Sequence, residues 1–311
     1  MVAAVLLCPG QGAQRVGMGR DLAEAIPTAR HVFEAVDDAL GVALSHVMWE
    51  GPESDLTLTH NAQPAILAHS LAAFAVVREV VQPVLGAGHS LGEYSAYAAA
   101  GALDVADAAR LVRRRGELMF EAGMQRAGTM AAVMGLDAAA VAQVCRDAST
   151  DDAVVVPANL NGPDQVVISG DPVAVERARG VLTEAGAKRV VPLKVSGAFH
   201  SPLMAPAEDG LRDELAGVSF ADPAFPVVAN ASAAPVETAD EARRLLGAQL
   251  TAPVRWVESM QYAASHATVE PFVEVGPGTV LSGLVRRIVS GREAIALGTA
   301  DQVTQFVERY A

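Results

Sequence analysis

Gly88-His89-Ser90-Leu91-Gly92 separates two different sequence patterns, and the contrast between them decides the fold prediction. Residues 83–88 form a short, mostly apolar run typical of a strand, and a helical stretch follows the motif as far as Ala100. Strand, tight turn and helix are the context that the G-x-S-x-G pattern needs. Its glycines leave room for neighbouring backbone, and the turn presents the Ser90 hydroxyl at a helix N-terminus. Backbone N–H groups there can stabilise an oxyanion.

This unit belongs to a longer alternation of apolar strands and Ala-rich helices. Such an alternation predicts an α/β protein with a largely parallel sheet. Strands are predicted at residues 2–8, 225–229 and 272–275, and helices over residues 67–81 and 104–124, the second with Asp104 as its N-cap.

From about Gly128 the pattern changes. Strands are predicted at 129–134, 154–158, 165–169 and 189–195, with helices over 137–148 and 171–185. The order β-α-β-β-α-β is that of a ferredoxin-like unit. We therefore expect residues 128–196 to form a small subdomain, inserted into a large α/β subdomain made of residues 1–127 and 197–311.

The composition excludes several classes of protein. At 311 residues and 51% hydrophobic residues, the chain can bury a sizeable core. Acidic residues outnumber basic ones, 36 to 23, so we expect no nucleic-acid partner. The apolar N-terminus is far shorter than the ~20 residues of a membrane span and lacks the basic start of a signal peptide. Two cysteines, Cys8 and Cys145, fit a cytoplasmic protein without a disulfide framework.

A serine nucleophile needs a base, and His200 is the candidate. It follows a predicted strand directly, in Gly197 to Met204, and active-site loops of α/β proteins lie at strand ends. The other histidines occur in ordinary helical or loop contexts and are expected to be structural or solvated: His31, His46, His60, His69, His89 and His266.

Nucleotide and metal chemistry are not favoured by the motifs. Gly10-Gln11-Gly12 follows the first strand, but Arg15 stands where a dinucleotide fingerprint needs Gly or Ala. The sequence contains neither a phosphate-binding loop nor a metal-ligand motif. The Gln11 turn is instead expected at the same sheet edge as Ser90, where it could complete an oxyanion hole.

Four motifs in this order resemble the malonyl-CoA:acyl-carrier-protein transacylase family, which includes the acyltransferase domains of fatty-acid and polyketide synthases. They are Pro9 to Gln14, Gly88 to Tyr94, Gly197 to Met204 and Val273 to Gly278, and they span nearly the whole chain. The resemblance implies an α/β-hydrolase-like large subdomain with the ferredoxin-like insert. It also implies transfer of a malonyl group from malonyl-CoA to the phosphopantetheine thiol of an acyl carrier protein, through a malonyl-serine and without a cofactor, in fatty-acid biosynthesis.

The resemblance also implies a role for each matching residue. Ser90 matches the nucleophile and His200 its base, and Gln249 matches the residue whose backbone carbonyl orients that histidine. Gln11 and Leu91 match the oxyanion-hole positions, which act through backbone N–H groups. The residues that match the acyl pocket are Arg115, which holds the malonyl carboxylate, Gln63, and Phe199, whose bulk goes with malonyl rather than branched acyl groups.

The chemistry of these residue types fits the roles. Thioester transfer needs a nucleophile, a base and an oxyanion hole. A planar guanidinium can bind a carboxylate through two parallel hydrogen bonds, and a buried arginine left without an anion disfavours neutral acyl groups. Arg110, Arg113 and Arg114 are close neighbours of Arg115, however, and most arginines on a helix are solvated.

A carrier protein is acidic, as this chain is, so docking requires a local basic patch. We expect one near the small subdomain, formed by Lys188, Arg189 and Lys194 with Arg286 and Arg287. The sequence shows no coiled-coil seam, and the resemblance favours a monomer.

Alternatives stay open at this point. A trans-acting acyltransferase of a polyketide synthase would share the chemistry. A serine thioesterase or other hydrolase would need a triad acid, for which Asp104, Asp107 or Asp164 could serve. A non-catalytic scaffold would lack the nucleophile or the base, and this chain has both.

Overall fold

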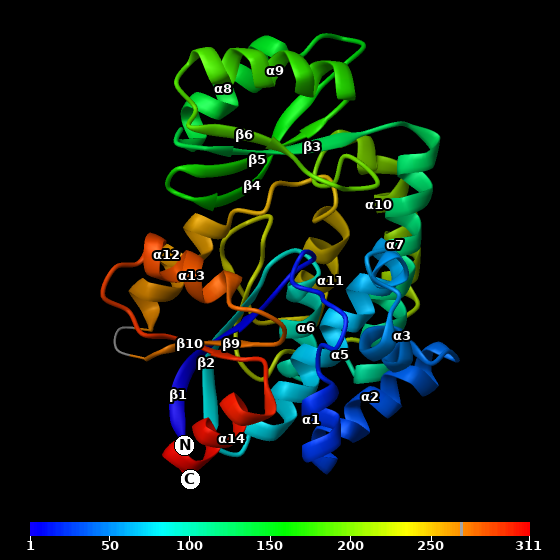
Figure 1. The fold of residues 1–311 in the computed structure, drawn as a ribbon, viewed down its shortest axis with the longest axis vertical. Helices are drawn as coiled ribbons and strands as arrows, with labels where there is room; N and C mark the ends of the chain where they lie inside the picture. Colours follow the sequence, from blue (N-terminus) through cyan, green and yellow to red (C-terminus); the bar gives the residue numbers. More distant parts are fainter. Residues whose placement is uncertain (268–269) are drawn as a thin grey trace.

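The computed structural model describes residues 1–267 and 270–311. It contains two β-sheets, one in a large body that holds both termini and one in a smaller lobe at the far end of the molecule (Figure 1). In the described residues no helix combines the length and the apolar character that a membrane span requires.

The large sheet has six strands in the order β10-β9-β1-β2-β7-β8. All neighbouring pairs are parallel except β7 and β8, so the predicted α/β class with a largely parallel sheet is confirmed. Its strands are β1 (Val2–Cys8), β2 (Val81–Gly88), β7 (Val227–Val228), β8 (Pro235–Val236), β9 (Phe272–Val275) and β10 (Ala294–Leu297).

Both faces of this sheet are covered by helices, as the apolar sequence of β1 requires. Leu6 and Cys8 pack into the core on one face, and Val5 and Leu7 pack into the core on the other. The second face, that of Val5 and Leu7, is covered by α12 (Trp256–His266) and α13 (Val280–Ile288). The helical elements on the side of Leu6 and Cys8 are more numerous: α1 (Arg20–Ala25), α2 (Pro27–Leu40), α3 (Leu44–Glu50), α4 (Glu53–Leu56), α5 (Thr59–Val77), α6 (Gly92–Ala99), α7 (Val105–Gln125), the 3₁₀ turn η1 (Pro202–Met204), α10 (Ala205–Ala216), α11 (Ala239–Ala248) and α14 (Ala300–Tyr310).

The small sheet is antiparallel, with the order β4-β5-β3-β6. Ala131 and Val133 face two helices, whereas Met130 and Ala132 face the large body (Figure 1). Its elements are β3 (Thr129–Met134), α8 (Ala138–Ala148), β4 (Val155–Gly162), β5 (Gln165–Gly170), α9 (Pro172–Glu184) and β6 (Arg189–Pro192). This is the predicted ferredoxin-like insert; the subdomain limits at residues 128 and 196 stay a prediction.

Some predicted element boundaries are wrong. The helix predicted over 67–81 is α5, which begins eight residues earlier at Thr59, and Val81 is already the first residue of β2. Polar residues and Pro64 had disguised its first turns, but burial overrides their low helix propensity. The strand predicted at 189–195 ends at Pro192, and the one at 225–229 is reduced to Val227–Val228.

Helix caps were predicted with mixed success. Asp104 accepts a hydrogen bond from the Asp107 N–H and caps α7 as expected. Asp171 occupies the N-cap position of α9 but makes no cap hydrogen bond; its carboxylate accepts from the Val154 N–H and pairs with Arg126 instead.

Candidate active site

Ser90 lies in the turn between β2 and α6, at the carboxyl edge of the large sheet. Its backbone has a φ of 54°, a left-handed conformation that few non-glycine residues adopt. A Cβ on Gly88 would overlap the Gly92 carbonyl, and one on Gly92 would overlap the Cys8 carbonyl. The two glycines therefore let three backbone segments meet at the strained turn that exposes Ser90, as the motif predicts.

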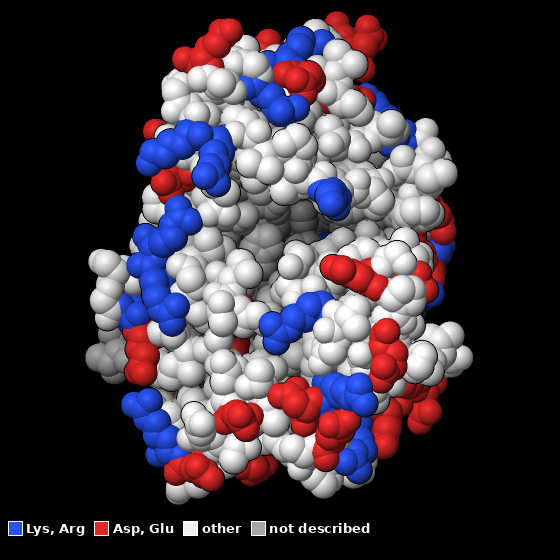
Figure 2. Space-filling model, viewed as in Figure 1, with Lys and Arg blue, Asp and Glu red and all other residues white. Residues whose placement is uncertain are grey.

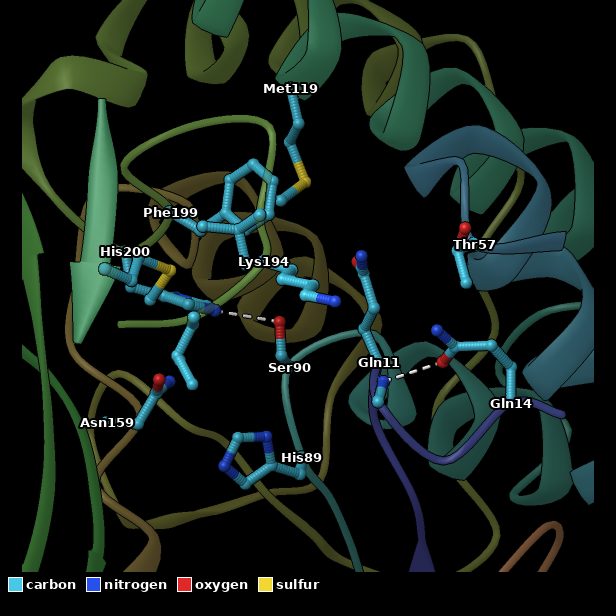
Figure 3. Close-up of a pocket in the computed structure, with 14 residues that line it drawn as sticks. Gln11, Gln14, Thr57, His89, Ser90, Met119, Asn159, Lys194, Phe199 and His200 are labelled. Atoms are coloured by element: carbon cyan, nitrogen blue, oxygen red, sulfur yellow. Dashed lines mark hydrogen bonds between the residues drawn. The ribbon is translucent and has the colours of Figure 1, made fainter. Parts of the chain in front are cut away.

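His200 lies beside the serine, although 110 residues separate the two in sequence. Its Nε2 is 2.8 Å from Ser90 Oγ (Figure 3). Its Nδ1 faces two backbone carbonyls, of Gln249 at 3.0 Å and of Ala252 at 3.1 Å. Carbonyls only accept, so Nδ1 carries the proton and Nε2 offers its lone pair to the serine hydroxyl. The family resemblance predicts the contact with the Gln249 carbonyl. The contact with the Ala252 carbonyl was not predicted.

Burial keeps this histidine uncharged. It lowers the pKa of His200 to about 3, and the positive charge of Arg115 and the neighbouring His89 act in the same direction. A neutral imidazole can accept a proton from a hydroxyl or a thiol. The geometry and the protonation state together suit a general base.

Arg115 reaches the same serine from α7. Its Nη2 donates to Ser90 Oγ at 3.0 Å and to Gln249 Oε1 at 2.8 Å, and its Nη1 donates to Gln63 Oε1 at 2.7 Å. The side chain is only 1% exposed, and every one of these acceptors is uncharged. In the described part of the chain no carboxylate lies within 4.0 Å of this guanidinium. The site thus holds a buried cation, close to the serine hydroxyl, without a paired anion.

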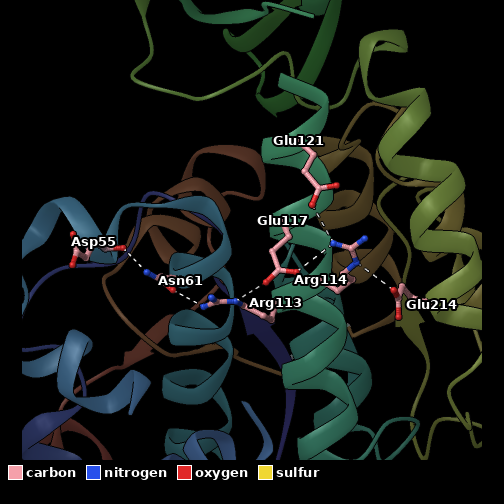
Figure 4. A network of polar contacts seen from close by, with 7 residues as sticks. All are labelled: Asp55, Asn61, Arg113, Arg114, Glu117, Glu121 and Glu214. Atoms are coloured by element: carbon pink, nitrogen blue, oxygen red, sulfur yellow. Dashed lines mark hydrogen bonds and ion pairs between the residues drawn. The ribbon is translucent and has the colours of Figure 1, made fainter. Parts of the chain in front are cut away.

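The neighbouring arginines of α7 point away from Ser90. The structure therefore singles out Arg115 among them, which the sequence alone could not do. Arg113 extends toward Asn61 of α5 and Arg114 toward Glu214 of α10, and both bind acidic side chains (Figure 4). Arg113 pairs with Glu117, and Arg114 pairs with Glu117, Glu121 and Glu214. Arg110 pairs with Asp107 at the surface.

Two backbone N–H groups near Ser90 remain available to a ligand. Those of Gln11, just after β1, and Leu91, at the N-cap of α6, have no hydrogen-bond acceptor among the described residues. The N–H of Ser90 itself is occupied by Asn230 Oδ1 at 2.7 Å. The Gln11 loop is held against the turn by the hydrogen bond from the His89 N–H to the Cys8 carbonyl, at 3.0 Å.

A cavity of about 480 Å³ opens in front of these groups, between the large body and the small lobe. Figure 3 shows Phe199, Met119 and Lys194 around His200, with Gln11 and Gln14 on the other side of Ser90. Phe199 was predicted to line an acyl pocket and does line this cavity. Met119, Gln14, Thr57, Asn159 and His89 also line it and were not predicted.

Two more residues of the site, Asn230 and Glu93, escaped prediction because their contacts are with distant parts of the chain. Asn230, after β7, holds the Ser90 N–H. Glu93 was quoted within the serine motif, yet nothing in the motif reveals that its carboxylate is fully buried. His89 was expected to be structural or solvated; its Nε2 lies 2.8 Å from Asn161 Oδ1, and burial lowers its pKa.

The candidate triad acids of a hydrolase lie away from His200. Asp104 caps α7, Asp107 pairs with Arg110, and Asp164 pairs with Arg287. Within the described residues no carboxylate contacts the histidine, whose polar partners are Ser90 and the two carbonyls. Nor do these residues include a cluster of three side chains that could hold a metal ion.

The five predicted basic residues do not form one compact group. Lys188, Arg189 and Arg287 surround a small hollow, where Arg287 pairs with Asp164. Lys194 lines the main cavity instead, and Arg286 donates to the Ala294 carbonyl at 2.6 Å. Figure 2 shows one face of the molecule, on which basic side chains follow one edge beside the central hollow.

The fold is that of an α/β protein, and its site pairs a serine hydroxyl with a neutral histidine, an arrangement that can form an acyl-serine. The sequence matches the family model described as "Acyl transferase domain" over residues 5–310, and the chain belongs to that family.

Individual relatives match this chain over almost the full length of both proteins. A malonyl CoA-acyl carrier protein transacylase of Bacillus subtilis is 44% identical over 298 residues, covering 96% of this chain and 94% of the relative. The crystal structure of an acyl-carrier-protein S-malonyltransferase from Bartonella henselae is 42% identical, with a TM-score of 0.93 over 100% of this chain and 99% of that one. A malonyl-transacylase solved in complex with its type II PKS acyl-carrier protein is 41% identical, also with a TM-score of 0.93, over 99% and 100% of the two chains.

Proposed function

We propose that this chain transfers a malonyl group from malonyl-CoA to the phosphopantetheine thiol of an acyl carrier protein, through a malonyl ester on Ser90. The observation that carries the proposal is the unpaired Arg115 guanidinium, 3.0 Å from the serine hydroxyl. An acyl group that ends in a carboxylate would satisfy this buried cation while its thioester carbon lies near Ser90.

Acylation begins with attack of Ser90 Oγ on the thioester carbonyl, while His200 Nε2 takes the hydroxyl proton. The negative charge that develops on the carbonyl oxygen is stabilised by the N–H groups of Gln11 and Leu91, each worth about 2.7–4 kcal/mol of barrier. The intermediate collapses, the C–S bond breaks, and His200 returns its proton to the departing thiolate of CoA.

Deacylation repeats these steps with a different nucleophile. The pantetheine thiol of the carrier protein gives its proton to His200 and attacks the malonyl ester. The C–O bond to Ser90 then breaks, and His200 protonates the serine oxygen. One thiol is exchanged for another, so the atoms balance and the proposed reaction needs no cofactor.

Selectivity for malonyl follows from the charge of Arg115. A neutral acetyl group would leave the guanidinium buried without an anion, which is costly. Gln63 and Gln249 hold the guanidinium in place, and Phe199 limits the width of the cavity beside it. We therefore propose substrate-binding roles for Arg115, Gln63, Gln249 and Phe199.

A hydrolase is the competing function, and the fate of the acyl-enzyme separates the two. Purified protein loaded with malonyl-CoA is offered a carrier protein in buffer, and the carrier adduct and free malonate are both quantified. We expect malonyl-carrier protein as the main product. Free malonate as the dominant product, with the carrier left unloaded, would contradict the proposal.

The pathway and the docking partner are also proposals. The relative solved with a type II PKS acyl-carrier protein supports a carrier protein as the acceptor, and we assign the chain to fatty-acid biosynthesis, with a trans-acting polyketide role as the alternative. A monomeric state and a cytoplasmic location stay predictions from the sequence.

A further inference from the structure

Glu93 is a buried carboxylate within the site that the proposed mechanism does not use. Its side chain is 0% exposed and lies one helical turn after Ser90. Its Oε2 accepts from the Asn230 N–H at 3.0 Å and from Gln249 Nε2 at 2.7 Å. Its Oε1 has no partner among the described residues. An ionisable group buried this completely is expensive to keep, so it requires an explanation.

The two donors, Asn230 and Gln249, each connect Glu93 to a residue of the proposed mechanism. Asn230 accepts from the Ser90 N–H at 2.7 Å and donates to the Gly88 carbonyl at 2.7 Å, so it fixes the nucleophile turn. Gln249 accepts from Arg115 Nη2 at 2.8 Å and donates to the Ser90 carbonyl at 3.0 Å. Glu93 is therefore one hydrogen-bonded residue away from both Ser90 and Arg115.

The Gln249 amide can satisfy all its partners in one orientation only. Glu93 Oε2 and the Ser90 carbonyl present acceptors, which need the Nε2 end of the amide. Arg115 only donates, so it needs the Oε1 end. A flipped amide would place its N–H groups against the guanidinium and its oxygen against Glu93. Glu93 and the Ser90 carbonyl together thus determine which end of the amide Arg115 meets, and of these two acceptors Glu93 is the side chain.

Because of this amide orientation, Arg115 meets a neutral oxygen and not a carboxylate. Its acceptors are all neutral, and Glu93 is separated from it by the width of an amide. A carboxylate in direct contact would form an ion pair and occupy the guanidinium edge that an acyl carboxylate needs. An amide oxygen instead orients the guanidinium and leaves it without a directly paired anion.

We propose that Glu93 is a positioning residue for acyl selectivity, which locks the Gln249 amide so that a neutral oxygen faces Arg115. This inference rests on the proposed function of the site. It assigns Glu93 no contact with the substrate and no proton transfer.

The test compares two substitutions at Glu93. Glu93→Gln keeps an oxygen that can accept from both donors, whereas Glu93→Met has none. The kcat/KM values for acylation by malonyl-CoA and by acetyl-CoA are measured from the intact mass of the chain. We expect the malonyl-to-acetyl ratio to fall about tenfold or more in Glu93→Met, mainly through the malonyl KM, and to be largely retained in Glu93→Gln.

A third variant tests the neutral oxygen directly. Gln249→Glu puts a carboxylate on Arg115, and a proton shared with Glu93 can keep the two carboxyls hydrogen-bonded. We expect the malonyl-to-acetyl ratio to collapse, because the guanidinium is already paired. This variant decides the proposal if Glu93→Met does not fold.

The control is Glu274→Met, at another carboxylate with 0% exposure, which accepts from the N–H groups of Leu281 and Ser282. It should lose stability and keep the ratio. Equal losses with both substrates in Glu93→Met, or an unchanged ratio in Gln249→Glu, would overturn the proposal. A parent protein that forms no malonyl adduct would contradict the proposed function itself, whatever the variants do.

Discussion

Two side chains from different parts of the chain meet at the Ser90 hydroxyl. His200 Nε2 lies at 2.8 Å and Arg115 Nη2 at 3.0 Å from the same oxygen. One is neutral and can take the hydroxyl proton, and the other is a cation that cannot. These contacts support the proposed division of roles, in which His200 takes the hydroxyl proton and Arg115 binds the carboxylate of the substrate.

The low pKa of His200 predicts an unusual pH profile for acylation. Because the base stays neutral until its pKa of about 3, the rate should not fall as the pH drops through 6.5, the ordinary value for histidine. Single-turnover acylation by malonyl-CoA, followed between about pH 5 and pH 8, checks this. A rate that halves near pH 6.5 would show that the imidazole is protonated there and would contradict the account.

Glu93 predicts a pH dependence of stability. Burial raises the pKa of this carboxyl from 4.5 to about 7, although its hydrogen bonds with Asn230 and Gln249 and the Arg115 charge oppose the shift. The folded state then binds more protons than the unfolded state between these values, so stability is lost as the pH rises through that interval. The expected loss is about 3 kcal/mol.

Urea denaturation at about pH 4.5 and about pH 7 measures this loss in the parent and in Glu93→Gln, which cannot titrate. The parent should lose more stability than the variant over this interval. Equal changes in both proteins would mean that Glu93 keeps an ordinary pKa in the folded state.

At the level of single residues the sequence is informative where a motif carries the chemistry. Ser90 stands in a strand–turn–helix motif, and His200 follows a predicted strand. Asn230 could not be found this way, because its partner Ser90 is 140 residues away in sequence and only the pairing of β2 with β7 brings them together.

At the scale of elements, the close packing of α5 on α7 places Arg115 beside Gln63. A Cβ on Gly116 would lie 2.6 Å from His60 Cα, a contact that backbone cannot relieve without moving a helix. We therefore expect Gly116→Ala to separate the two helices, to cost about 1–3 kcal/mol of stability, and to raise the malonyl-CoA KM severalfold.

Gly180→Ala in α9 is the matched control, because a Cβ there meets nothing within 4 Å. That change should leave the KM unchanged and stabilise the helix by up to about 1 kcal/mol. Thermal unfolding and steady-state kinetics of the two variants check both expectations. A Gly116→Ala protein with the parent's KM would show that helix spacing does not govern Arg115.

Element prediction succeeded where a clear periodicity or a helix cap marked the element, and it failed at the start of α5. The strand at 129–134 and the helix starting after Asp104 were placed correctly. Helix α5 is buried over most of its circumference, so it lacks the polar face that marks a helix in sequence. Its first turns, which contain Gln63, were missed because polar residues and Pro64 interrupt the apolar pattern there.

At the scale of the whole molecule, the cavity lies where the large body and the small lobe meet. Lys188 and Arg189 of the small lobe are exposed around a separate small hollow, together with Arg287 of α13. The overall charge of −13 repels an acidic carrier, so local positive potential has to guide its approach.

This arrangement predicts that Lys188→Glu combined with Arg189→Glu raises the carrier-protein KM about tenfold at low salt, with little change in kcat. Arg78→Glu is the control, since Arg78 is exposed just before β2, at the opposite end of that strand from Ser90. Equal KM values for the parent and the double variant would remove these residues from the docking surface.

The arrangement of the two sheets was predictable in class but not in detail. Alternating strands and helices predicted both units, and the order β-α-β-β-α-β identified the insert. How the lobes enclose a cavity depends on side chains such as Phe199 and Lys194, whose positions no local pattern specifies.

The most direct test of the central claim is the site and identity of the acyl adduct. The parent, Ser90→Ala and Arg115→Ala are each mixed with malonyl-CoA and, separately, acetyl-CoA, and the adduct is located by peptide mass spectrometry. We expect a malonyl group on Ser90 of the parent, no adduct on Ser90→Ala, and loss of the preference for malonyl over acetyl in Arg115→Ala. An adduct on another residue, or a malonyl preference that persists without Arg115, would contradict the account.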